Sequence, residues 1–179
     1  KKNIKLPVPL FDPTTKEDTH DRAISEAQMV AEGLITKELL AEVKDTATKL
    51  FLRGQKLAEA RGLILVDTKY EFGLDEKNKL MLIDEIHTPD SSRYWKAASY
   101  NERLIKGEEP EYFDKEFLRL WFKEHCDPYN DPVLPEAPKD LVAELSRRYI
   151  EIYETITGQP FDHDFSVPVM ERIAKNLKK

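Results

Sequence analysis

Charged side chains alternate along one short stretch near the middle of the 179-residue chain. Asp67, Lys69 and Glu71 stand two residues apart, and an extended strand places residues with this spacing on one face. They directly follow Leu63–Val66, an apolar run that is typical of the start of a buried strand. Charges at the mouth of a buried strand are costly unless something compensates them. We therefore expect this row of charges to emerge from the core into a cleft.

A further carboxylate, Asp84, follows a second apolar run, Leu80–Ile83, which predicts a second strand. The segment between the two runs, residues 73–79, is polar and turn-like, so a β-hairpin is the economical interpretation. The register of this hairpin decides where Asp84 points. If the numbers of paired residues sum to an odd total, Asp84 shares the face of Lys69 and Glu71; if the total is even, it points away. The sequence alone leaves the register open.

Two carboxylates that converge with a lysine suit a metal ion and an anionic substrate. Mg²⁺ prefers oxygen ligands, typically one or two carboxylates with water and phosphate, which Glu71 and Asp84 would supply. Lys69 can neutralise a substrate carboxylate or phosphate. Downstream, Asp90–Arg93 offers hydroxyls, backbone donors and a guanidinium, which can grip a phosphate. The alternative is a set of cross-strand salt bridges on a solvated face, followed by an ordinary turn. Spacing alone leaves both interpretations open.

Amphipathic patterning predicts that helices flank the hairpin, which makes the fold class α+β. A capping box of Ser25 and Gln28 opens the first helix, and Asp114 caps a later one. The predicted helices cover residues 25–33, 36 to about 60, 114–122, 138–158 and 166 to about 177. Prolines exclude regular structure from residues 1–23 and 127–138, and residues 96–113 show no sustained period, so we expect a long surface excursion there.

The composition limits the class of protein. Lys and Arg number 28 against 34 Asp and Glu, and the net charge of −6 argues against a nucleic-acid partner. No apolar run approaches the roughly 20 residues that a membrane-spanning helix needs. The single cysteine, Cys126, excludes an intramolecular disulfide and a Cys-rich zinc module. It suits a reducing compartment, so we expect a cytoplasmic location.

Two long motifs around the charged residues in the middle of the chain resemble the paired signatures of the phosphoribosylaminoimidazole-succinocarboxamide synthase (SAICAR synthetase) family. They are Gly62–Gly73, GLILVDTKYEFG, and Asp84–Trp95, DEIHTPDSSRYW. The segment Pro7–Lys16, PVPLFDPTTK, with His20 and Asp21 after it, resembles the part before the family's long helix. Residues 149–158, YIEIYETITG, resemble its C-terminal part. The resemblance covers nearly the whole chain.

The resemblance implies an ATP- and Mg²⁺-dependent ligase that joins L-aspartate to carboxyaminoimidazole ribonucleotide (CAIR) in purine biosynthesis. It implies that the CAIR carboxylate is activated as an acyl phosphate, which the aspartate amine then displaces. The implied catalytic residues are Lys69, Glu71 and Asp84, the last two on the metal side. The implied substrate-binding residues are Asp67, Lys69, Asp90, Ser92 and Arg93, with Ser92 and Arg93 at the ribose phosphate. The implied nucleotide-side residues are Lys16, Asp21, Glu71 and Asp84.

The chain departs from the family pattern in one respect. The family begins with a lobe that carries a glycine-rich phosphate loop, whereas the six glycines here form no cluster. We therefore expect a single α+β catalytic portion of the enzyme over residues 1–179: an extended segment (1–23), a helix–hairpin core (24–95) and a helical part (96–179). We expect little turnover from these residues alone, an N-terminal portion of the same enzyme as a possible partner, and an oligomer as a further option. The alternative function is a non-catalytic interaction or scaffold domain.

Overall fold

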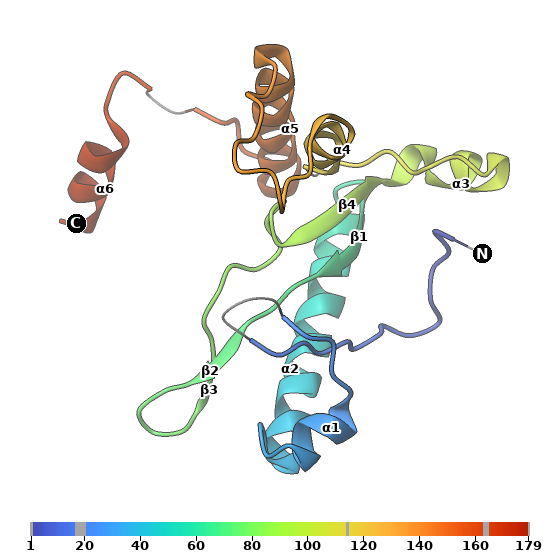
Figure 1. Cartoon of the computed structure of the whole chain (residues 1–179), viewed down its shortest axis with the longest axis vertical. Coiled ribbons are helices and arrows are strands. Elements are labelled where there is room, and N and C mark those ends of the chain that lie inside the picture. The colour runs from blue at the N-terminus through green and yellow to red at the C-terminus, as the bar shows by residue number, and fades with distance from the viewer. Residues whose placement is uncertain (1, 17–20, 114, 163–164, 179) are drawn as a thin grey trace.

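The computed structural model describes residues 2–16, 21–113, 115–162 and 165–178, and in these ranges a run of short strands lies between N-terminal and C-terminal helices (Figure 1). In chain order they are α1 (Glu26–Ala31), α2 (Lys37–Glu59), β1 (Leu63–Thr68), β2 (Phe72–Leu74), β3 (Leu80–Leu82), β4 (Ser92–Lys96), α3 (Ala97–Lys106), α4 (Glu116–His125), α5 (Lys139–Thr157) and α6 (Val169–Leu177). The predicted α+β class is confirmed. None of the helices in the described ranges is both long and apolar enough to cross a lipid bilayer.

Side-chain caps start the first two helices where the sequence predicts them. The Oγ of Ser25 accepts a hydrogen bond from the backbone N–H of Gln28, and the Gln28 side chain accepts one from the Ser25 N–H, which completes the predicted capping box of α1. Thr36 caps α2, because its Oγ1 accepts a hydrogen bond of 3.2 Å from the N–H of Leu39. These bonds satisfy backbone donors that a helix leaves unpaired at its first turn.

Replacing Thr36 with alanine is expected to lower the free energy of unfolding by about 1 kcal/mol, since the N–H of Leu39 loses its partner. Urea unfolding of the full-length protein that carries this sequence measures the change. Thr48 is the matched control, because its hydroxyl bonds back to the carbonyl of Lys44 inside the same helix. Thr48→Ala should be close to neutral. Equal losses in the two variants would contradict the capping role.

The strand that follows α2 does not pair as predicted. β1 is antiparallel to β4, with Leu63 opposite Lys96 and Leu65 opposite Tyr94. The ladder shifts between Leu65 and Asp67, so that Val66 forms a β-bulge. The prediction that Leu63–Phe72 forms a hairpin with residues 80–83 is therefore wrong for β1. The proline and polar residues at 89–91 hid the strand that begins directly after them.

The predicted hairpin exists further along the chain as β2 and β3, which project from the rest of the molecule in Figure 1. Asp75 builds the turn, because its Oδ1 accepts hydrogen bonds from the N–H groups of Lys77 and Lys79. Phe72 pairs with Leu82, which gives the even register. The regular ladder ends before Asp84, however, so the register does not decide where that carboxylate lies.

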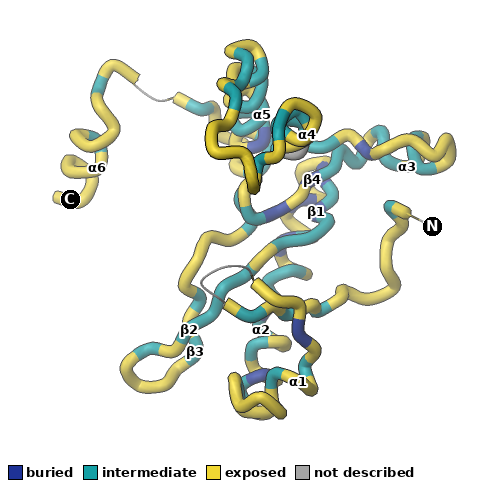
Figure 2. Tube along the Cα trace, in the orientation of Figure 1, coloured by how far each residue is buried: buried dark blue, intermediate teal, exposed yellow. Residues whose placement is uncertain are grey.

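The core lies where β1 and β4 meet the helices α2 and α5. Figure 2 shows buried segments around this ribbon, and others near α1. Leu65 and Ile152 are the most deeply enclosed side chains, each 1% exposed. The buried cluster consists of Ala58, Leu63, Leu65, Tyr94, Phe113 and Ile152. This core holds the end of β1 in place and thereby fixes the start of the charged row.

The other helices match the sequence in part. α5 and α6 lie where they are predicted, and α4 carries the predicted aromatic stripe; Asp114, its predicted cap, lies outside the described residues. The expected irregular excursion over residues 96–113 is wrong for Ala97–Lys106, which forms α3. α3 follows β4 without a break, and no side chain caps its first turn, so the sequence offers no start signal for this helix.

Candidate functional site

Three charged side chains meet where β1 leads into β2. The Oε1 of Glu71 lies 2.5 Å from the Nζ of Lys69 and 3.0 Å from the Nζ of Lys16. Lys69 and Glu71 are neighbours through their spacing of two, whereas Lys16 reaches the carboxylate from the extended N-terminal segment. Glu71 is 22% exposed, against 55% for Lys69 and 74% for Lys16. The carboxylate is therefore sheltered beneath two ammonium groups that face solvent.

Two further carboxylates surround this trio. The pKa of Lys69 is raised above its ordinary value of 10.5, chiefly by the hydrogen bond with Glu71 and then by the negative charges of Glu71, Asp21 and Asp84. Asp21 and Asp84 therefore lie near Lys69, as the sequence predicts for Asp84. The predicted companion of Asp21, His20, lies outside the described residues. The group presents positive and negative charge side by side.

The pKa of Glu71 lies below its ordinary value of 4.5, because the hydrogen bonds from Lys69 and then Lys16 favour the ionised carboxylate. The stabilisation from this shift is complete above pH 4.5 and is lost as the pH falls through the folded-state pKa. In an NMR titration of the full-length protein, we expect Lys69→Met to move the Glu71 midpoint up toward 4.5 and Lys16→Met to move it less. Lys49→Met, which removes an unrelated ion pair with Asp45, is the control.

Asp67 does not join the trio. The bulge at Val66 sets Asp67 opposite Arg93 of β4, and both of its oxygens lie 3.0 Å from the Nε of Arg93. The predicted row of three charges is thus divided, with Asp67 bound across the ribbon to another predicted site residue. A guanidinium held in this way is oriented, with its N–H donors in a fixed planar fork.

The remaining predicted residues of the second motif have different surroundings. Ser92 is only 4% exposed, and its hydroxyl donates a hydrogen bond of 2.8 Å to the Oγ1 of Thr68. Asp90 is exposed and pairs with Lys115. In this conformation Ser92 supports the β1–β4 ribbon, whereas Arg93 and Asp90 are open to solvent.

A half-buried contact beside the trio was not predicted as part of the site. The hydroxyl of Tyr70, which stands between Lys69 and Glu71, lies 2.6 Å from the Nε2 of His87. From the sequence, His87 is interpreted either as a substrate contact or, in preference, as a hydrogen-bonded loop residue, and the hydrogen bond is confirmed. The signal that could have singled it out is Gly54, a glycine in the interior of the predicted long helix, because such a glycine often marks a close contact.

The donor set fits a magnesium ion that is shared with a phosphate. Within the described ranges, no three His, Cys, Asp or Glu side chains gather into a preformed metal site. Mg²⁺ is commonly held by only one or two carboxylates together with water and substrate phosphates. Glu71 and Asp84 offer that number, and both ammonium contacts of Glu71 use the same oxygen, Oε1.

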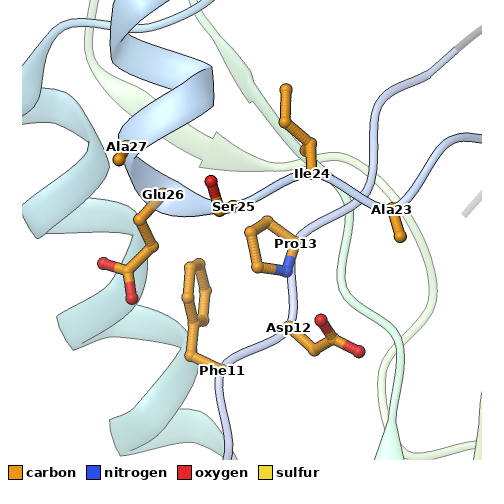
Figure 3. Close-up of a pocket in the computed structure, with 8 residues that line it drawn as sticks. All are labelled: Phe11, Asp12, Pro13, Ala23, Ile24, Ser25, Glu26 and Ala27. Atoms are coloured by element: carbon orange, nitrogen blue, oxygen red, sulfur yellow. The ribbon is translucent and has the colours of Figure 1, made fainter.

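Two concavities in the described part of the chain lie away from these residues. One cavity of about 560 Å³ is formed where the N-terminal segment meets the start of α1 (Figure 3). Phe11, Pro13 and Ile24 give it apolar walls, and Asp12 and Glu26 add negative charge. A second, of about 420 Å³, lies between α5 and the segment around Tyr112. Neither of these two cavities is lined by a residue that the sequence predicts for the site.

The fold and the cluster together define an α+β protein with a mixed-charge surface site built from two sequence motifs. Comparison with protein families places it more closely: the model of the SAICAR synthetase family matches residues 1–135, and the chain belongs to this family. A phosphoribosylaminoimidazole-succinocarboxamide synthase of Legionella pneumophila (strain Paris) is 54% identical over 180 residues, which cover 100% of this chain and 58% of the relative. A chloroplastic synthase of Arabidopsis thaliana is 55% identical over 99% of this chain and 44% of its own length.

Solved structures agree with this assignment. The SAICAR synthase of Saccharomyces cerevisiae, in complex with SAICAR, superposes with a TM-score of 0.71 and 40% identity, over 89% of this chain and 50% of that protein. A SAICAR synthetase in complex with ADP gives a TM-score of 0.64 and 28% identity, over 89% and 55%. The chain thus spans between about two fifths and three fifths of the length of these relatives.

Proposed function

We propose that this chain forms part of an ATP-dependent ligase that joins L-aspartate to CAIR and releases SAICAR, ADP and phosphate. The observation that carries the proposal is the cluster of Lys16, Lys69 and Glu71 with Asp84 beside it. The trio carries one net positive charge, and the carboxylates of Asp21 and Asp84 add negative charge nearby. A site of mixed sign suits a reaction in which carboxylates, a triphosphate and a divalent cation must come together.

Each residue then has a role that follows from its charge. Lys69 and Lys16 attract the anionic oxygens of the nucleotide and the CAIR carboxylate, which reduces the repulsion between them. Arg93, oriented by Asp67, binds the ribose phosphate of CAIR. Ser92 and Asp90 support the substrate side of the site, and Asp21 supports the nucleotide side. Glu71 and Asp84 would hold Mg²⁺, which when bound neutralises phosphate charge.

The reaction proceeds in two balanced steps. A carboxylate oxygen of CAIR attacks the γ-phosphorus of ATP, the bond to the bridging oxygen breaks, and ADP leaves. The amine of aspartate then attacks the carbonyl carbon of the acyl phosphate, inorganic phosphate leaves with the former carboxylate oxygen, and the nitrogen gives up a proton. The protein's contribution is to hold two anions and an amine in contact, which converts encounters in solution into a reaction within one complex.

The experiment that tests the proposal measures ADP release by the full-length protein that carries this sequence. We expect sustained ADP release over many turnovers only when ATP, L-aspartate and CAIR are all present, together with a product whose mass equals CAIR plus aspartate minus water. Sustained release without aspartate or without CAIR would instead indicate a phosphotransferase. No release under any condition would favour an interaction domain, in which the charge cluster is only a solvated surface.

A further inference from the structure

His87 is held in place by three elements that are far apart in the sequence. Its Nε2 lies 2.6 Å from the hydroxyl of Tyr70, in the connection between β1 and β2. Its backbone carbonyl accepts a hydrogen bond of 2.7 Å from Tyr94 of β4, a side chain of the buried core. Its ring rests against Gly54 of α2. We call Gly54, Tyr70, His87 and Tyr94 the His87 latch.

The contact with α2 requires a glycine at position 54. A Cβ on Gly54 would lie 2.4 Å from the Cε1 of His87 and 2.8 Å from each ring nitrogen, closer than real atoms approach. The ring cannot withdraw without giving up its hydrogen bond to Tyr70. His87 also has a positive φ of 56°, which is uncommon for a residue with a side chain. A strained backbone and a glycine inside a helix are both tolerated here, which indicates that the arrangement has a use.

The hydrogen bond between the side chains of Tyr70 and His87 joins two neutral groups. Burial lowers the pKa of His87 and raises the pKa of Tyr70 to about 12. At neutral pH the bond therefore joins a phenol to an uncharged imidazole, and the tautomer of the imidazole decides which of the two groups donates. A neutral bond inside the protein holds its two partners without adding charge to the ionic cluster beside it.

We propose that His87 is a positioning residue that fixes the segment carrying Asp84 against the segment carrying Lys69 and Glu71. Tyr70 stands between Lys69 and Glu71 in the sequence, and Asp84 precedes His87 by three residues. The backbone bonds from Lys69 N–H to the Ser91 carbonyl and from Ile83 N–H to the Glu71 carbonyl join the same two segments, and the bond from Tyr70 to His87 adds a side-chain link between them. This inference rests on the proposed function for its effect on turnover, but its effect on structure can be measured separately.

The test combines amide hydrogen exchange with kinetics in the full-length protein. His87→Leu and Tyr70→Phe are each expected to speed exchange over residues 84–91 and to lower kcat about tenfold. The reason is that the segment carrying Asp84 is no longer fixed relative to Lys69 and Glu71. The double variant should lose no more than either single variant, since both remove one bond. His87→Gln, whose amide can accept from Tyr70, should recover most of kcat; a role in filling space alone would predict that leucine serves as well.

Gly54→Ala probes the same contact from the helix. Alanine normally stabilises a helix interior relative to glycine, so faster exchange over residues 84–91 in this variant would support displacement of the ring. His125→Leu, on α4, is the control and should change neither measurement. Unchanged exchange and kcat in Tyr70→Phe and Gly54→Ala would overturn the inference. If the wild type forms no SAICAR but the exchange differences appear, the latch stands and the proposed function fails.

Discussion

Glu71→Gln is expected to lower kcat about 10³-fold in the full-length protein, the largest effect of any single change at this site. Glutamine keeps the shape of the side chain but removes the negative charge that Lys16 and Lys69 share through Oε1. The two ammonium groups then repel each other and lose their common anchor. The proposed metal ion loses one of its two carboxylate ligands at the same time.

The same substitution should leave the melting temperature almost unchanged. Both lysines are more than half exposed, and ion pairs of this kind contribute about 0–1 kcal/mol to stability. Glu151 provides a matched control, because it also accepts from two cations, Lys96 at 3.4 Å and Arg147 at 2.7 Å. Glu151→Gln should keep its kcat. Steady-state kinetics and thermal unfolding of both variants separate a chemical role from a structural one.

Asp84→Asn extends this test to the second carboxylate. We expect a loss of kcat that higher Mg²⁺ concentrations partly restore, since the variant weakens the binding of the ion without removing the lysines. Normal turnover in both Glu71→Gln and Asp84→Asn would contradict the assignment of the site. A loss in Glu71→Gln alone would leave the lysine pair as the essential feature.

The sequence predicted best the elements whose signal is local. α2 and α5 extend over several turns with a continuous apolar stripe. The capping box at the start of α1 is formed by Ser25 and Gln28, which are only three residues apart, so its hydrogen bonds could be predicted from the local sequence. The strand pairing was wrong because β1 and β4 are joined across a long intervening segment. The polar turn at residues 89–91 hides β4 in the sequence, and packing against Ala58 and Ile152 decides that it pairs with β1. α3 was missed because it follows β4 directly and has no side-chain cap at its start.

The site was predicted to the extent that its geometry is local. Lys69 and Glu71 meet because extended backbone turns every second side chain the same way. Lys16 lies 55 residues before Glu71, so no spacing rule could bring it there; only the resemblance to a family did so. Asp67 was expected beside Lys69, but a one-residue bulge turned it toward Arg93. A bulge of this kind leaves no periodic signal in the sequence.

Arg93→Met is expected to raise the KM for CAIR about 100-fold while kcat changes much less. The proposed contact is with the ribose phosphate, which is remote from the bond that forms, so the lost energy is the energy of substrate binding. Charge-assisted hydrogen bonds from arginine contribute about 1.5–3 kcal/mol, and the loss of such bonds accounts for a rise in KM of about 100-fold. Lysine restores the charge but not the paired donors, so Arg93→Lys should recover only part of the affinity.

A variant of Asp67 tests the role of Arg93 in a second way. Because both of its oxygens accept from the Nε of Arg93, Asp67→Asn should loosen the guanidinium and raise the same KM by a smaller factor. Arg147, which pairs with Glu144 on α5, is the control arginine, and Arg147→Met should leave the KM for CAIR unchanged. If Arg93→Met instead lowers kcat at unchanged KM, Arg93 acts on the reacting groups, and the ribose phosphate must bind elsewhere.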